Sequence, residues 1–149
     1  MVQLGDTRLS WRKIIWRQAP KTLGRGQYGG RLAFAPDGTL FITGGDRQRF
    51  DVAQDMSSTI GKTVRINTDG SIPKDNPFRH RRGADPAIYS VGHRNALGAA
   101  IHPATGVLWE AEMGPQGGDE VNVIAPGANY GWPVVSNGEN YDGTPIPDH

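Results

Sequence analysis

The chain has 149 residues, with 16 lysines and arginines against 15 aspartates and glutamates, and no cysteine. A net charge of +1 provides no field that would draw nucleic acid or an acidic membrane, and the lack of cysteine excludes disulfides and thiolate metal sites. No apolar run approaches the roughly 18 residues of a membrane span, and Met1–Asp6 lacks the pattern of a signal peptide. We therefore expect a globular chain of about one domain, with neither nucleic acid nor a membrane as partner.

Short apolar segments alternate with turns, because 21 glycines and 11 prolines are spread along the chain. The β-rich segment Arg12–Arg17 predicts a first strand. Leu32–Ala35 and Thr39–Thr43 flank a Pro-Asp-Gly turn, in which proline presets φ, aspartate bonds to the backbone and glycine accepts positive φ. These two segments predict a hairpin. Only Asp51–Thr59 could hold a short helix, since no stretch keeps a period of 3.6 residues.

Two later segments follow the same turn chemistry. A Thr-Asp-Gly turn within Val64–Ile72 predicts another hairpin, and Gly98–His102 with Val107–Glu110 repeats the first hairpin around a second turn that contains proline and glycine. Repeated small antiparallel units are typical of propeller blades, so one interpretation is an all-β fold of about two to three blades of four-stranded antiparallel sheet. A β-sandwich with two such hairpins is the alternative.

These blades are too few to close a ring, which needs roughly four to eight of them. An incomplete ring leaves unpaired strand edges and a half-exposed core. We therefore expect the chain to be a piece of a larger propeller, or to associate with other copies through its open blade edges.

Four ordered motifs carry a resemblance to a known family. They are GGRLAFAPDG from Gly29, GHRN from Gly92, GPQGGDE from Gly114 and NYGWP from Asn129. Together they resemble the soluble quinoprotein sugar dehydrogenases, the glucose/sorbosone dehydrogenase family of six-bladed propellers that use pyrroloquinoline quinone (PQQ) and calcium. The resemblance implies a partial six-bladed propeller, with residues 1–149 forming a fragment of one domain, its central blades, and no separate domain.

The resemblance also implies an activity. Family members oxidise the anomeric hydroxyl of an aldose to a lactone: a base removes the hydroxyl proton while hydride passes to the quinone, and a dye or a cytochrome-like protein then accepts the electrons. The cofactor carries the redox chemistry, and the protein supplies orientation, charge and the base. Such proteins are typically periplasmic or secreted, which implies the same location for this chain.

The resemblance assigns Arg94 and Asn95 to the quinone, whose carboxylates and carbonyl oxygens suit a guanidinium fork and an amide donor. It assigns the carbonyl oxygens of Gly114 and Pro115 to calcium, which prefers oxygen ligands. The preceding cofactor-binding position, commonly His or Gln in relatives, holds Met113, whose thioether offers little to a hard cation. His93 is expected to be a packed structural residue rather than a ligand.

Three further positions complete the expected site. The carboxylate of Glu120 and the carbonyl of Tyr130 resemble ligands of a second, structural calcium, although Glu120 could equally be a surface charge. Asp46 matches an acidic residue close to the sugar, and as a residue of a Gly-Gly-Asp stretch it could equally make a local turn bond. Gln27 stands where relatives carry the histidine base, and an amide does not accept a proton near neutral pH.

The sequence thus predicts an aldose dehydrogenase with Gln27 and Asp46 at the catalytic position, and little sugar:dye oxidoreductase activity from this chain alone. Asp46 could replace the missing base. The alternatives are a non-catalytic propeller segment that binds carbohydrate or calcium or acts as a scaffold, and an unrelated small β domain.

Overall fold

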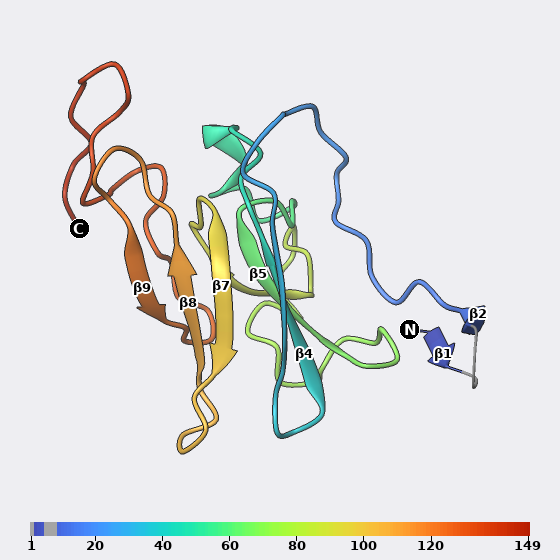
Figure 1. Cartoon of the computed structure of the whole chain (residues 1–149). Helices are drawn as coiled ribbons and strands as arrows, with labels where there is room; N and C mark the ends of the chain where they lie inside the picture. The colour runs from blue at the N-terminus through green and yellow to red at the C-terminus, as the bar shows by residue number, and fades with distance from the viewer. Residues whose placement is uncertain (1, 5–8) are drawn as a thin grey trace.

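The computed structural model describes residues 2–4 and 9–149, and every regular element in these ranges except one short 3₁₀-helix is a β-strand (Figure 1). The elements are β1 (Val2–Leu4), β2 (Leu9–Arg12), β3 (Gly29–Phe34), β4 (Thr39–Gly44), the 3₁₀-helix η1 (Phe50–Val52), β5 (Lys62–Asn67), β6 (Ile88–Val91), β7 (Ala96–Ile101), β8 (Leu108–Glu112) and β9 (Glu120–Val123).

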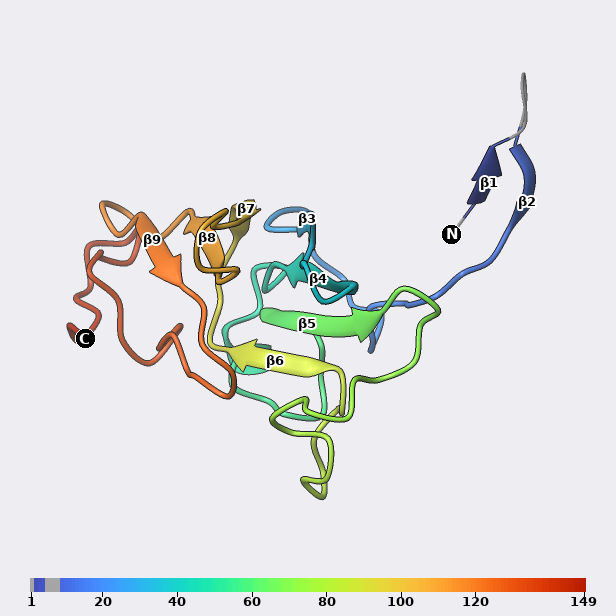
Figure 2. The same cartoon turned by 90° about the horizontal axis from the view of Figure 1, so that it is seen from below.

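The strands form three antiparallel sheets in chain order. A four-stranded sheet runs β3-β4-β5-β6, a three-stranded sheet runs β7-β8-β9, and β1 pairs with β2. The two larger sheets lie side by side with β3 against β7, whereas β1 and β2 lie apart from them (Figures 1 and 2). The segment between β6 and β7 therefore connects one sheet to the other.

Successive side chains of β4 point to opposite faces of the sheet, and the core is correspondingly divided into two apolar clusters. Leu40 and Ile42 point to one face and pack with β5 residues, whereas Phe41 points to the other face and packs with Leu108 of the neighbouring sheet. The strand is thus buried on both faces. The second cluster joins the two sheets.

The first predicted hairpin is confirmed together with its turn chemistry. β3 and β4 pair in register near the turn, with Phe34 opposite Leu40 and Leu32 opposite Ile42. Asp37 Oδ1 accepts a hydrogen bond from the backbone N–H of Thr39 at 2.9 Å, and Gly38 has a φ of +83°. The second predicted hairpin is confirmed as β7 and β8.

The predicted strand over Arg12–Arg17 is wrong for most of its length, because β2 ends at Arg12 and residues 13–17 join no sheet. Ile15 and Trp16 instead pack against the first apolar cluster. The apolar residues of this segment therefore pack on the core and do not form a strand.

The predicted hairpin within Val64–Ile72 is also wrong. Its turn forms, with the N–H of Asn67 bonded to the carbonyl of Ser71 at 2.9 Å, but no strand follows. The other edge of β5 is taken by β6, which pairs Thr63 with Ser90, and the Pro73 nitrogen carries no proton to extend a ladder.

The possible helix over Asp51–Thr59 is reduced to the single turn η1 at Phe50–Val52. Beyond it, Asp55 Oδ1 accepts hydrogen bonds from the backbone N–H and the hydroxyl of Ser57 at 2.9 and 2.8 Å. These local side-chain bonds favour a turn over a continued helix.

Lys62 at the start of β5 is fully buried, and its ammonium donates to the carbonyls of Val52 at 2.7 Å and Ile60 at 2.9 Å. Burial lowers the pKa of Lys62 from 10.5 to about 8, although Asp55 opposes the shift. Between these values the unfolded chain binds more protons than the folded chain, so Lys62 makes stability rise with pH from about pH 8 to pH 10.5.

We expect the Lys62→Met variant to lose this pH dependence. Relative to the variant, the wild-type chain should gain about 3 kcal/mol of unfolding free energy across that interval, measured by denaturant titration at several pH values. Lys74→Met, which removes an exposed lysine, should follow the wild-type curve. Parallel curves for wild type and Lys62→Met would contradict the burial of a titrating ammonium.

Candidate active site

Arg94 occupies the connection between the two sheets and is almost fully buried. Its Nη1 donates to the carbonyl of Met113 at 3.0 Å and to the carbonyl of Gly114. Its guanidinium carbon lies 5.3 Å from the ring centre of Trp132 and 5.7 Å from that of Tyr141. The guanidinium is thus held among two backbone carbonyls and two aromatic rings.

Asp46 lies two residues after β4 and is fully buried, and its backbone N–H donates to the carbonyl of Arg94 at 2.8 Å. Its Oδ2 accepts a hydrogen bond from Trp132 Nε1 at 2.8 Å, and its Oδ1 accepts one from the backbone N–H of Gln48 at 2.7 Å. Burial raises the pKa of Asp46 above its ordinary value of 3.8, although these hydrogen bonds and Arg94 lower it. Asp46 is therefore a stronger proton acceptor than a solvated aspartate.

Gln27 lies between Asp46 and Arg94. In the amide orientation that satisfies both neighbours, its nitrogen donates to the Asp46 carboxylate and its oxygen accepts from Arg94 Nη2 at 2.8 Å. The backbone of Gln27 approaches Gly45 so closely that a Cβ there would collide with the Gln27 carbonyl. The structure thus brings Gln27, Asp46 and Arg94 together.

A hollow of about 370 Å³ opens beside Arg94 and Trp132, within the size range of small-molecule sites. The Nε of Arg94 is buried and has no hydrogen-bond partner among the described residues. Aromatic walls and a guanidinium with an uncommitted donor suit a flat anionic ring such as PQQ. The remaining lining residues are Phe50, Pro115, Asn140, Tyr141 and Asp142.

The four residues assigned to calcium all line one small cavity, together with Arg94. Its volume of about 10 Å³ holds a single water-sized species. The Pro115 carbonyl accepts from the Gly118 N–H at 3.1 Å, and the Gly114 carbonyl accepts from Arg94. Oxygen donors and cavity size fit calcium, but calcium at the Gly114 carbonyl requires the guanidinium to withdraw from it. The four residues are Gly114, Pro115, Glu120 and Tyr130.

Asn95 and Met113 lie at the site in a different way from that expected. The Asn95 side-chain oxygen accepts from the backbone N–H of Gly29 at 3.1 Å, so only its amide donor could serve a ligand. Met113 lines a second hollow with Leu97 and Val121, and its carbonyl accepts a hydrogen bond from Arg94. Sequence reasoning considered the side chain of Met113, whereas the backbone of this residue contributes to the site.

Glu112, Trp132 and Tyr141 belong to the site but were not predicted. Trp132 lies in the NYGWP motif, so the motif signalled it, but its bond to Asp46 spans 86 positions. Glu112 precedes Met113 and accepts a hydrogen bond from the backbone N–H of Arg94. No local pattern marks a buried glutamate as the partner of a distant backbone group.

Comparison with known proteins identifies the family. The profile of the Glucose / Sorbosone dehydrogenase family matches residues 1–149, and the chain belongs to that family. It is 44% identical over 136 residues to the aldose sugar dehydrogenase YliI of Escherichia coli K12, covering 91% of this chain and 37% of that protein.

Two solved structures give the same result. The apo-form crystal structure of the soluble aldose sugar dehydrogenase from Escherichia coli superposes with a TM-score of 0.93 and 41% identity, over 97% of this chain and 42% of that one. The PQQ-bound aldose sugar dehydrogenase from Streptomyces coelicolor gives a TM-score of 0.76 and 36% identity, over 94% of this chain and 40% of that one. The expected all-β, partial propeller fold is confirmed.

The chain spans about two fifths of the length of these relatives. Within residues 2–4 and 9–149, no helix has the length and apolar character needed to cross a membrane.

The bond between Trp132 and Asp46 predicts a specific loss of stability. Trp132→Phe removes a buried donor from a carboxylate, so we expect the free energy of unfolding to fall by about 1.5–3 kcal/mol in urea titrations. The same change in the Asp46→Asn background should cost less. Trp109→Phe, at a partly exposed position, should cost about 0.5 kcal/mol, and equal losses in all three cases would contradict the assignment.

Proposed function

We propose that the protein acts in PQQ-dependent oxidation of aldose sugars at the anomeric hydroxyl. Membership of the family supports this, as do the names of the relatives and the PQQ-bound state of one of them. The single observation that carries the proposal is the Arg94 guanidinium, held over Trp132 and Tyr141 with an uncommitted Nε, at the edge of the 370 Å³ hollow.

PQQ, when bound, supplies the carbon centre that accepts hydride from the sugar. Arg94 binds its anionic groups, and the faces of Trp132 and Tyr141 orient its plane. Asp46 is the carboxylate nearest to the position of the missing base, and we assign it the sugar hydroxyl proton. Gln27, which bonds to Asp46, orients that hydroxyl through its amide.

Calcium is the second proposed cofactor. The carbonyls of Gly114 and Pro115 would hold the ion beside the quinone, and the carboxylate of Glu120 and the carbonyl of Tyr130 would hold a second, structural calcium. Displacement of Arg94 from the Gly114 carbonyl by calcium would free Nη1 for the quinone. Ligand binding and metal binding would then depend on each other.

We propose that residues 1–149 belong to a single propeller domain whose further blades come from a longer chain or from other copies. Apolar side chains exposed on β3 (Leu32 and Phe34) and on β9 (Val121 and Val123) support this, because a neighbouring blade would cover them. A periplasmic or secreted location and a dye or cytochrome-like electron acceptor belong to the same proposal.

A non-catalytic role in binding carbohydrate or calcium is the second candidate. The observation that favours it is Gln27, which occupies the position of the base with a group that does not titrate.

PQQ binding tests the first step without requiring turnover. We expect PQQ to quench tryptophan fluorescence, since Trp132 lines the hollow, and Arg94→Lys to weaken binding at least tenfold because an ammonium cannot reproduce the planar fork. Arg82→Lys, at an exposed arginine, should bind as the wild type does. Equal affinity in Arg94→Lys would remove the observation on which the proposal rests.

Restoring the histidine separates the two candidate functions. With PQQ, calcium, an aldose and an electron-accepting dye, the wild-type chain should reduce little dye, and Gln27→His should raise the rate by about 10²–10⁴-fold. Gln116→His, which adds a histidine at an exposed position, should leave the rate unchanged. Unchanged activity in Gln27→His with intact sugar binding would favour the binding module.

A further inference from the structure

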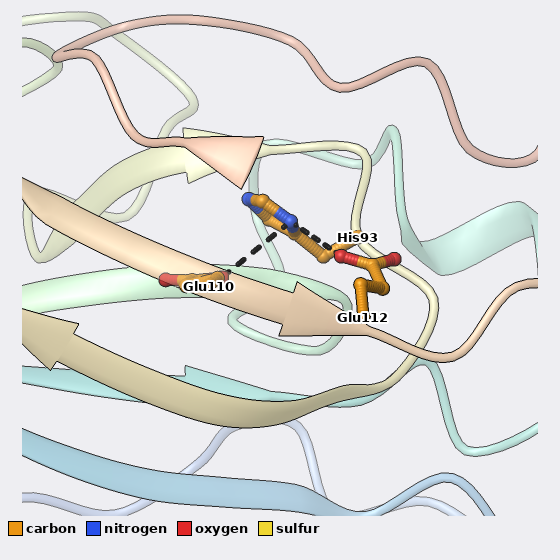
Figure 3. A group of neighbouring side chains, drawn as sticks. All are labelled: His93, Glu110 and Glu112. Atoms are coloured by element: carbon orange, nitrogen blue, oxygen red, sulfur yellow. Dashed lines mark hydrogen bonds and ion pairs between the residues drawn. The ribbon is translucent and has the colours of Figure 1, made fainter. Parts of the chain in front are cut away.

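Three ionisable side chains meet in the buried space between β6, β7 and β8 (Figure 3). His93 Nδ1 lies 2.9 Å from Glu112 Oε2 and 3.8 Å from Glu110 Oε2, and the three atoms all lie within 4.8 Å of one another. The His93 and Glu110 side chains have no exposed surface, and the Glu112 side chain is 5% exposed. None of the three side chains takes a direct part in the proposed sugar chemistry, although Glu112 also accepts a hydrogen bond from the backbone N–H of Arg94.

The outward atom of each side chain already has a partner. His93 Nε2 lies 2.8 Å from the Ser90 hydroxyl, and Thr63 donates to Glu110 Oε1 at 2.6 Å. Glu112 Oε1 accepts from the backbone N–H of Arg94. Metal ligands are commonly fixed in this way, because the bond at the outer atom sets the histidine tautomer and the carboxylate orientation.

The inward atoms are less well satisfied. Glu110 Oε2 is buried and has no hydrogen-bond partner among the described residues, although it is directed toward His93 Nδ1. A buried carboxylate oxygen without a donor is costly. Glu112 and His93 share one hydrogen bond, which leaves Glu110 Oε2 with only the longer 3.8 Å contact to His93.

We propose that His93, Glu110 and Glu112 form a binding site for a divalent transition metal ion of the zinc class. One imidazole nitrogen and two carboxylate oxygens are a ligand set that suits zinc, manganese or cobalt better than calcium or magnesium. Tetrahedral ligands about 2.0–2.2 Å from zinc lie about 3.3–3.6 Å apart, so the 2.9 Å contact widens and the 3.8 Å contact shortens on binding. A divalent ion also neutralises the two buried carboxylates.

The proposed ion is distinct from calcium at the Gly114–Pro115 turn. Its ligands lie in the connection between β6 and β7 (His93) and on β8 (Glu110 and Glu112) and include a nitrogen atom, whereas the turn offers oxygen alone. The proposed metal site does not rest on the proposed sugar chemistry, because the three side chains converge without PQQ, but it shares Glu112 with the candidate active site.

Metal content after refolding tests the site, since a buried ion enters most readily while the chain folds. The protein is unfolded with a chelator, refolded with and without Zn²⁺, desalted and analysed for zinc by mass spectrometry. We expect one zinc ion per chain in the wild type and none in Glu110→Gln. Co²⁺ in place of Zn²⁺ should give the visible absorption bands of a low-coordinate site.

Two further variants keep the test decisive. Ser90→Ala leaves the ligands in place and removes only the outer partner of His93, so it should fold and bind zinc about 10–100-fold more weakly. Glu120→Gln, at the candidate calcium site, should retain wild-type zinc affinity. A wild-type chain that refolds without retaining zinc, or undiminished zinc binding in both Glu110→Gln and Ser90→Ala, would overturn the proposal.

Discussion

The candidate site depends on one buried carboxylate, Glu112 at the end of β8. One of its oxygens accepts a hydrogen bond from the backbone N–H of Arg94, and the other is hydrogen-bonded to His93 Nδ1 at 2.9 Å. These bonds attach the connection between the sheets to the strand that leads into Gly114. Arg94 precedes β7, whereas Met113 and Gly114 follow β8. The bonds of Glu112 therefore hold the Arg94 backbone near the two carbonyls that its guanidinium contacts.

Arg94 then has two roles that compete. Its guanidinium bonds to the carbonyls of Met113 and Gly114, and the Gly114 carbonyl is also an oxygen that calcium would use. A positively charged side chain on a carbonyl stabilises the turn without metal, and a divalent ion at the same oxygen must displace it. The turn is therefore stabilised by a cation with or without calcium, and only the identity of that cation changes.

The parts of the fold that sequence predicted are those governed by local chemistry. The Asp37 and Gly38 turn specifies its hairpin because the bond to Thr39 and the positive φ involve only neighbouring residues. The pairing of β5 with β6 could not be predicted in this way, since twenty residues separate the strands and the segment that follows β5 forms a turn of its own.

The same distinction holds for the site. Motif resemblance predicted Arg94 and Asp46, but it did not indicate that Gln27 lies between them. The roles of Glu110 and Glu112 depend on their burial. The alternation of side chains along β8 predicts that both lie on the same face of the strand, but it does not predict what covers that face. His93 was expected to be structural, and its partners became visible only once two sheets were packed together.

The substitution at Gln27 shows how binding and proton transfer can be separated. A neutral imidazole offers one donor and one acceptor, and the Gln27 amide offers the same pair to Asp46 and Arg94. The amide therefore preserves the hydrogen bonds that shape the site while removing the group that titrates. What remains to accept a proton is Asp46, whose pKa is raised by burial but whose two oxygens are already bonded to Gln48 and Trp132. Protonation of Asp46 makes its oxygens weaker acceptors for these two hydrogen bonds, and this cost is the physical reason for the low activity that we expect from the chain.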